Sequence, residues 1–523
     1  MRKIIFFALL LFGAISLLAQ KTNPLDLEFQ RLAVRRFIFS NNLILSEFVP
    51  AEIVNFQSMY PAFTISENHE AKNDESFRPK IESGKLLLDK TCGKEAASIY
   101  MGGINPYATY DLEIAECSAE SEIGLEFAQY GLRDRIQVVA IPKNGISIRI
   151  LKNNTILRDT LFNCRLPLSD FSLKIQLYGR TLGVFLTENG ETRYIGHLPV
   201  KEHFGDVLDF RKPEILKNVT FNLISNLKGK VLINKASSYL SSGIGQADIR
   251  AVSYEDLSPV LDDGRLWFTF SCRGLDTPQS TQGVLSMNPS VFDVRFEGMI
   301  VFDHGDGMWR NDYAAHLFYD RNAKEWRAYA CDFGGSTNKE GRAKTGLLTA
   351  TSKHDPRKGF SIMQAMRVET ESMEGHNEDP CIFYDENVKK WRLLTSAFVK
   401  GNIAARVYES DIWNGKFTEI TSPIVENSTG TSLQKIGGKI YALMGGKGNL
   451  RIHSYPDLQE LGELKLNLQP HWPKPAGRIW ASVVPLPEGY PYRYVLLTMD
   501  RPNFPGVKGN NWSYGGLYFY GAD

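Results

Sequence analysis

Cysteine is scarce in this chain, with six residues among 523. No two of them form a Cys-x-x-Cys pair, which excludes a zinc ribbon, and six are too few for a disulfide framework at this length. One or two disulfides are compatible with the sequence, but cysteine spacing alone does not define which residues would pair. Cys381 lies in an apolar stretch and is expected to be a buried, small apolar residue.

An excess of either charge is also missing. The 60 Lys and Arg residues balance 59 Asp and Glu residues, which leaves +1, and no long run of one sign occurs. This balance argues against a nucleic-acid partner, which would need a basic face. After residue 20 no apolar run reaches the ~20 residues that span a bilayer, so no membrane span is expected. P-loop, Gly-x-Ser-x-Gly and His-Glu-x-x-His motifs are absent, so none of them competes with the acidic sites described below.

The first twenty residues have the pattern of a secretory signal peptide. Arg2 and Lys3 precede an apolar run from Ile4 to Leu18, and Ala19 offers a cleavage site before Gln20. A membrane anchor would need a longer run, and the lack of a nearby cysteine argues against a lipoprotein. We therefore expect a secreted or periplasmic protein.

Residues 21–235 are expected to form a first domain. After a short helical start around Leu25 to Phe37, short strands with period-two alternation follow one another, as in Ile136–Ile141 and Phe171–Leu177. This pattern is typical of an antiparallel β-sandwich of the jelly-roll or lectin-like kind. All eight tryptophans lie at or after Trp267, so the region lacks the platforms on which sugars usually stack. A structural role is favoured over carbohydrate binding, which stays open.

A ten-residue repeat organises the rest of the chain, residues 236–523. Phe318–Arg327 and Phe383–Arg392 are identical at seven of ten positions, and each consists of an apolar strand, an Asp-x-Asn-x-Lys turn and a strand that starts at Trp. Three weaker copies bring the total to five. Their aromatic residues are Trp267, Trp326, Trp391, Tyr441 and Tyr494. Four strands in each of five units predict an all-β fold with a five-bladed propeller.

Acidic residues just before the repeats are expected to converge on the propeller axis. Counted back from the turn aspartate, Asp256 in the first copy and Asp379 in the third share one register. Asp312 in the second copy lies two residues earlier, and Glu378 adjoins Asp379. Glycoside hydrolysis needs such a set, in which one acid protonates the leaving oxygen, another activates water or attacks, and a third adjusts the first.

This arrangement resembles the five-bladed propeller glycoside hydrolases of family 43 and its relatives, families 32 and 62. Those families take an Asp from the first blade, an Asp from the second and a Glu from the third. The resemblance implies Asp256 as base, Asp312 as orienting group and Glu378 as acid. Its short motifs lie beyond residue 240 or so, and four rival acids compete: Glu255, Asp306, Glu374 and Asp379. The Asp-box of six-bladed sialidases is absent.

Residues near these acids are expected to bind substrate: Arg250, Arg273, Trp309, Arg310, His316, His376, Asp379, Arg478 and Trp480. The arginines would either bind an acidic sugar or orient the catalytic acids. The tryptophans would either stack on a sugar ring or pack in a blade core. The histidines would either bind a ligand or relay protons, or only form hydrogen bonds within their loops. No cofactor or metal is expected, although a structural calcium ion stays open.

The sequence therefore predicts a secreted glycoside hydrolase that acts on a plant or complex poly- or oligosaccharide. Two alternatives stay open. One is a phosphorylase of the same fold, resembling family 130, and the other is a glycan-binding surface protein without activity. The oligomeric state is not predicted.

Overall fold

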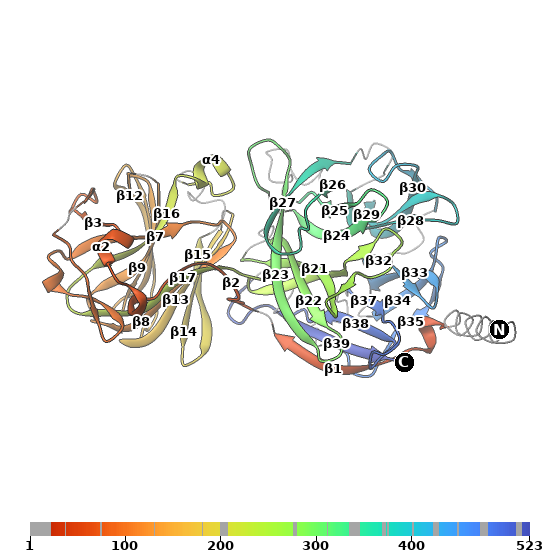
Figure 1. Cartoon of the computed structure of the whole chain (residues 1–523), viewed down its shortest axis with the longest axis horizontal. Coiled ribbons are helices and arrows are strands. Elements are labelled where there is room, and N and C mark those ends of the chain that lie inside the picture. Colours follow the sequence, from red (N-terminus) through yellow and green to blue (C-terminus); the bar gives the residue numbers. More distant parts are fainter. Residues whose placement is uncertain are drawn as a thin grey trace, which may run out of the picture.

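The computed structural model describes residues 22–523 except 37, 74–75, 130, 180, 199–207, 276–279, 311, 334–345, 369–372, 374–375, 400–401, 422–427, 447–448, 471–479 and 509–514. The expected signal peptide, Glu374 and Arg478 therefore lie outside the described residues. The chain folds into two bodies side by side, both made almost wholly of strands (Figure 1). None of the helices in the described part is long and apolar enough to cross a membrane. All six cysteines are free thiols.

The first body, here called the two-layer domain, consists of two antiparallel sheets between residues 43 and 240. The first sheet has the order β12 (Thr155–Phe162), β11 (Gly145–Lys152), β10 (Arg135–Ile141), β9 (Glu122–Gln129), β16 (Val219–Asn226), β7 (Ala96–Gly103), β3 (Ala62–Ile65) and β4 (Ala71–Asn73). The second has the order β15 (Glu191–Leu198), β14 (Thr181–Glu188), β13 (Ser169–Tyr178), β8 (Ala108–Cys117), β17 (Val231–Leu240), β6 (Lys85–Leu88) and β5 (Lys80–Glu82), and β2 (Leu43–Phe48) also pairs with β17.

The two sheets share one apolar core. Alternate residues of β8, such as Leu112, face alternate residues of β9, such as Leu125, and both side chains are fully buried. This period-two burial is what a sheet packed on one face requires. Short helical segments connect the strands: η2 (Pro50–Glu52), α2 (Phe56–Met59), η3 (Lys90–Cys92) and α4 (Pro213–Leu216).

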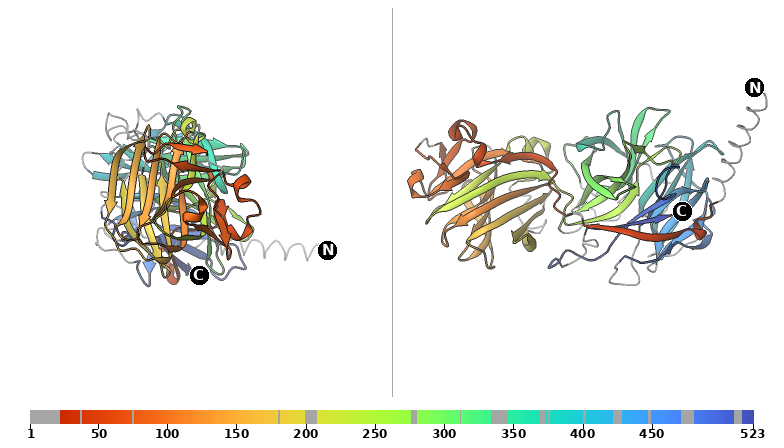
Figure 2. Two further views of the ribbon diagram at one scale, coloured as in Figure 1. Left: turned by 90° about the vertical axis from the view of Figure 1, so that its left-hand side faces the viewer. Right: turned by 60° about the horizontal axis from the view of Figure 1, so that its bottom comes forward.

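The helical start expected around Leu25 to Phe37 is wrong. A single 3-10 turn, η1 (Pro24–Asp26), is followed by strand β1 (Glu28–Arg36). This strand pairs antiparallel with β39 (Gly516–Ala522) and parallel with β36 (Lys465–Leu466), so it belongs to the second body, not the first. Figure 2 shows β1 beside the last strands of the chain. Residues with good helix propensity thus become a strand because a sheet edge is available to them.

The second body is a five-bladed β-propeller, as predicted. Blade I contains β18 (Gly245–Ala251), β21 (Arg265–Arg273), β22 (Ser280–Asn288) and β23 (Asp293–Asp303), and blade II contains β24 (Tyr313–Asp320), β25 (Glu325–Cys331), β26 (Leu347–Ser352) and β27 (Gly359–Arg367). Blade III contains β28 (His376–Asp385), β29 (Lys390–Val399), β30 (Asn402–Ser410) and β31 (Thr418–Glu419), and blade IV contains β32 (Thr429–Ile436), β33 (Lys439–Gly446), β34 (Asn449–Ser454) and β35 (Glu460–Glu463). Blade V contains β37 (Ser482–Pro485), β38 (Tyr494–Met499), β39 and β1.

The first strand of each blade lies innermost. These strands contact one another in the order β18, β24, β28, β32, β37 and back to β18, which closes the ring. The outer strands β23 and β27 pair in parallel and join blades I and II into one sheet. The two copies of the sequence repeat are the β24–β25 and β28–β29 hairpins, in which Asp320 and Asp385 accept backbone N–H bonds in the turn. The repeat is therefore scaffold.

Candidate active site

Four of the five inner strands contain the same bulge. In each, one extra residue interrupts the pairing with the second strand of the blade. That residue has a positive φ: Asp248 (57°), Ala314 (59°), Asp379 (58°) and Gly430 (64°) in β18, β24, β28 and β32. A bulge of this kind redirects side chains and often lies beside an active site. The bulge therefore defines structurally equivalent positions in blades I to IV.

By this equivalence Asp248, not Asp256, corresponds to Asp379, and the register counted back from the turn was wrong for blade I. The chain leaves β18 at Ala251 and forms two short strands, β19 (Ser253–Tyr254) and β20 (Leu261–Asp262), before β21 begins. Strand β19 pairs with Phe318 and Tyr319, near the end of β24 that lies away from the bulge. This excursion separates the turn from the inner strand by residues that blades II and III lack.

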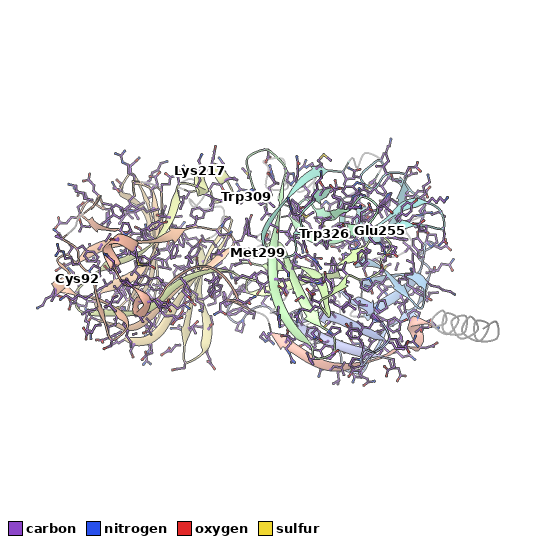
Figure 3. All side chains as sticks on the ribbon, in the orientation of Figure 1. Cys92, Lys217, Glu255, Met299, Trp309 and Trp326 are labelled. Atoms are coloured by element: carbon purple, nitrogen blue, oxygen red, sulfur yellow. The ribbon has the colours of Figure 1, made fainter. Side chains whose placement is uncertain are left out.

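Asp256 consequently lies away from the other acids. Its carboxylate accepts a bond from the Ser258 backbone N–H at 3.0 Å and lies 3.1 Å from Arg321 Nη2. The rival Glu255 also bonds Arg321, with Nε at 2.9 Å. Figure 3 shows Glu255 on the far side of the propeller and Trp309 on the side that faces the two-layer domain.

Asp248 is buried and held by two donors within blade I. Ser271 Oγ donates to its Oδ2 at 2.5 Å, and Arg273 Nη2 donates to the same oxygen at 3.2 Å. The Arg273 guanidinium lies 5.1 Å from the centre of the Tyr313 ring at the start of β24. These contacts fix the orientation of the Asp248 carboxyl group.

Asp379 is also buried, but its donors are neutral. Its Oδ2 accepts bonds from the Gly430 N–H at 2.8 Å, Thr429 Oγ1 at 3.1 Å and Ser396 Oγ at 3.4 Å. Burial, and then the charge of Asp248, raise the pKa of Asp379 to about 6, although the Gly430 bond opposes them. Asp379 therefore exchanges its proton within the pH range in which many enzymes work.

Cys331, the last residue of β25, lies against the bulge of blade III. The Asp379 backbone N–H donates to Cys331 Sγ at 3.2 Å. Burial raises the pKa of the Cys331 thiol, and the charges of Asp379, Glu378 and Asp248 raise it further. Glu378 is only partly buried, unlike its two neighbours. Asp248 and Asp379 thus occupy equivalent positions in blades I and III, and their charges, with that of Glu378, act on Cys331.

Asp312 stands at the leading end of blade II and is buried. His304, in the loop after β23, donates from Nε2 to Asp312 Oδ2 at 2.8 Å. This hydrogen bond, ahead of the opposing burial, raises the pKa of His304. Sequence reasoning missed His304, because no repeat contains it. Its position in a glycine-rich loop eight residues before Asp312 is the one signal that could have identified it.

Arg250 and Arg273, like Arg310 described below, form bonds within the protein. Arg273 pairs with Asp248, as described. Arg250 is buried, donates from Nη2 to the Thr431 carbonyl at 2.9 Å, and lies 5.1 Å from the centre of the Trp480 ring. These contacts connect blades I, IV and V around the axis. They fit the orienting role that the sequence left open for the arginines.

His316 is a structural link between blades. Its Nδ1 accepts the Ile382 N–H at 3.1 Å, so Nε2 carries the hydrogen and donates to Ser253 Oγ, also at 3.1 Å. Burial, and then the charge of Arg250, lower the pKa of His316 well below its usual value, so the ring is neutral. His376, the first residue of β28, is partly buried with its ring 5.7 Å from that of Phe398.

Trp309 and Arg310 lie in the loop between blades I and II. The Trp309 backbone N–H donates to the Arg211 carbonyl of the two-layer domain at 2.7 Å, and its ring lies 5.6 Å from that of Phe360. Arg310 donates to Asp306 at 2.7 Å, so the carboxylate of this rival acid is paired with a guanidinium. The two-layer domain therefore contacts the propeller close to Asp312.

A small hollow lies farther along the axis, beyond the bulges. Its lining includes Arg250, Ser253, His316, Ser432 and Gln434, but none of the grouped acids. The acids and this hollow are thus separate features of the central channel.

No protein family model matches the chain, and no curated protein sequence matches it. Several solved structures are similar in fold, and each covers 53% of this chain. They include a family 117 glycoside hydrolase of Zobellia galactanivorans (10% identity, 84% of that chain, TM-score 0.37) and a family 43 enzyme of Xanthomonas citri (13%, 87%, 0.36). A third is the levansucrase of Bacillus subtilis (10%, 86%, 0.37). The five-bladed arrangement itself rests on the strand order above.

Proposed function

We propose that this protein is a secreted glycoside hydrolase that acts on a plant or complex poly- or oligosaccharide. The observation that supports the proposal best is that Asp248 and Asp379 occupy the equivalent bulge position in the inner strands of blades I and III, with Glu378 adjacent to Asp379. Asp312 from blade II completes one acid from each of the first three blades. Glycosidases use two carboxyl groups with different protonation states, and this group contains acids with different surroundings.

Glu378 is proposed as the general acid, because it is the least buried of the group and can reach a leaving-group oxygen. Asp248 is proposed as the base, since Arg273 and Ser271 hold its carboxyl group in a fixed orientation. Asp312 orients the substrate or the acid through its own fixed position beside His304.

An acidic sugar receives less support than the sequence suggested. Arg250 donates a hydrogen bond to the Thr431 carbonyl, and Arg273 donates one to the Asp248 carboxylate. We therefore propose a glycan substrate without assigning it a charge.

The proposal is tested by screening the purified chain against plant cell-wall polysaccharides, followed by substitution of the acids. On any substrate found, Asp248→Asn and Glu378→Gln should each lower kcat by about 10²–10⁴-fold, the usual contribution of a general acid or base. Asp256→Asn is the matched control and should retain activity. Full activity of Asp248→Asn, with loss in Asp256→Asn, would contradict the assignment.

Two further outcomes of the screen favour the alternatives. Turnover that depends on inorganic phosphate would identify a phosphorylase. Saturable glycan binding without turnover, across the whole panel, would identify a binding protein.

A further inference from the structure

Three metal-ligating side chains lie together at the entrance to blade II. One nitrogen of His304 and one carboxylate oxygen each of Asp312 and Asp332 all lie within 4.8 Å of one another. Asp312 and Asp332 are buried, and His304 is partly exposed. We infer that this group is a binding site for one divalent transition-metal ion of the Zn²⁺ type. The inference goes beyond the proposed function and does not depend on it.

The fold brings the three ligands together from three strand ends. Asp312 precedes β24 and Asp332 follows β25, and the residues that they flank, Tyr313 and Cys331, are paired across the two strands. The two carboxylates are therefore fixed opposite each other by strand register.

His304 comes from the loop that follows β23. Asp303 and Trp309 form a bridge that folds this loop back on itself. Gly305 and Gly307 have φ of 75° and 76°, a conformation that glycine adopts without a steric penalty. The Asp303 side chain accepts the Gly305 N–H at 2.9 Å and fixes the turn. The loop therefore holds the imidazole beside Asp312.

The separations suit one ion. Ligand atoms about 2.0–2.2 Å from zinc are about 3.0–3.5 Å apart when adjacent. His304 Nε2 and Asp312 Oδ2 are 2.8 Å apart, and the largest separation in the group is no more than 4.8 Å. Shifts of less than about 1 Å in each side chain would complete the coordination. Three protein ligands would leave a fourth position for water.

The local charge also favours a dication. Residues 303–312, with Asp332 and its ion-pair partner Arg367, contain four carboxylates (Asp303, Asp306, Asp312, Asp332) and two guanidiniums (Arg310, Arg367). Arg310 bonds Asp306 and Arg367 lies 2.5 Å from Asp332. The acids thus outnumber the guanidiniums, and two of the four acids, Asp312 and Asp332, are buried, where uncompensated charge is costly.

The ligand types select the metal. Calcium and magnesium prefer oxygen ligands only, whereas an imidazole nitrogen with two carboxylates suits zinc, manganese or ferrous iron. The site therefore differs from the structural calcium ion that the sequence left open, and from the expectation of no metal.

The Tyr107 hydroxyl of the two-layer domain gives a second indication that this region is incomplete without a ligand. It is fully buried, and no hydrogen-bond partner for it exists among the described residues. Its ring stacks on Phe360, 6.2 Å away, which in turn contacts Trp309 in the His304 loop. Asp312 is the charged group with the largest effect on the pKa of Tyr107, after burial. A metal-bound water would give this hydroxyl a partner.

The test uses the whole chain, stripped of metal with a chelator and titrated with ZnCl₂ in a calorimeter. One ion should bind per chain, and ZnCl₂ should raise the Tm while CaCl₂ at the same concentration should not. His304→Ala should weaken zinc binding by at least about 10²-fold. The matched control, His376→Ala, lies outside the group and should bind as the unaltered chain does.

A crystal of the unaltered chain soaked in ZnCl₂ makes the test independent of variant folding. An anomalous peak between His304, Asp312 and Asp332 would support the site. Absence of that peak, or equal affinity of His304→Ala and His376→Ala, would overturn it and leave His304 as a hydrogen-bond partner of Asp312 alone.

Discussion

The inner strands of blades I and III have the same bulged backbone as those of blades II and IV, but different chemistry. At the residue with positive φ, blades I and III carry Asp248 and Asp379, whereas blades II and IV carry Ala314 and Gly430. The bulge is therefore a property of the repeated blade, and the acid is an addition to it. This separation of scaffold from chemistry is common in folds that host many functions.

The two acids also differ from each other. Asp248 has a guanidinium partner, whereas Asp379 has only neutral donors and a raised pKa. The same backbone position thus provides one carboxyl group paired with a guanidinium and one whose pKa is raised. Substitutions at the four bulges can separate the cost of the backbone from that of the charge.

The largest stability effect is expected from Arg273→Gln. It leaves the buried Asp248 carboxylate without its cation, which typically costs 3–5 kcal/mol. Asp248→Asn combined with Arg273→Gln removes both charges and should recover more than half of that loss. Denaturant unfolding of the two variants and the parent measures this. Additive losses in the double variant would show that Arg273 does not stabilise through Asp248.

Asp379→Asn should stabilise the protein at neutral pH and not at pH 4. The folded pKa of about 6 lies above the ordinary 3.8, so the folded state keeps a proton that the unfolded state releases. The stability of the parent therefore falls as pH rises from about 4 to 6, by about 1–3 kcal/mol, and this contribution stays absent above pH 6. The asparagine cannot titrate and avoids that fall, and it tolerates a positive φ.

The measurement is the difference in unfolding free energy between Asp379→Asn and the parent, at half-unit steps from pH 4 to 8. The difference should grow with pH and then level off, because other acids titrate in both proteins and cancel. A constant difference would show that Asp379 does not titrate in this range.

Blades I and III also show which parts of the fold and of the site could be predicted from the sequence. The Phe-Tyr-Asp repeat predicted the hairpins of blades II and III and the blade count. It gave the wrong acid in blade I, because residues 252–264 make an excursion that pairs with β24 of the next blade. Such tertiary pairing leaves no local pattern. The first copy of the repeat coincides with the β20–β21 hairpin and not with the inner strand.

Two other features depended on contacts distant in sequence. Strand β1 is made of residues that favour helix, and it is a strand only because β39 lies open beside it. His304 is in no repeat, and its bond to Asp312 depends on a loop that folds back through the bridge between Asp303 and Trp309. The hydrophobic period and the composition of the sequence predict strands and turns. The pairing of β1 with β39 and of His304 with Asp312 depends on the closed propeller and cannot be predicted from them.

Blades II and IV provide a matched pair for the backbone alone. Gly430→Ala places a Cβ at a φ of 64° and should cost about 1–2 kcal/mol. Ala314→Gly removes the same strain, at a φ of 59°, but glycine has more conformational freedom in the unfolded chain, which opposes the gain. We therefore expect Ala314→Gly to stabilise the protein by less than about 1 kcal/mol. Thermal unfolding of both variants measures this. Equal losses would show that Ala314 is held by packing and is not strained.

The smallest effect is expected from Asp256→Asn, in the excursion of blade I. The Asp256 carboxylate and its partner Arg321 are both partly exposed, and such pairs contribute about 0–1 kcal/mol. Arg321 keeps Glu255, which accepts its backbone N–H at 3.0 Å and its Nε at 2.9 Å. Glu255→Gln should therefore cost more, about 1–2 kcal/mol, because Glu255 is buried and forms hydrogen bonds to a charged group. If Asp256→Asn lowers the unfolding free energy more than Glu255→Gln does, the Asp256 carboxylate is held more tightly than its exposure indicates. The excursion would then be stabilised by charge and not by its pairing with β24.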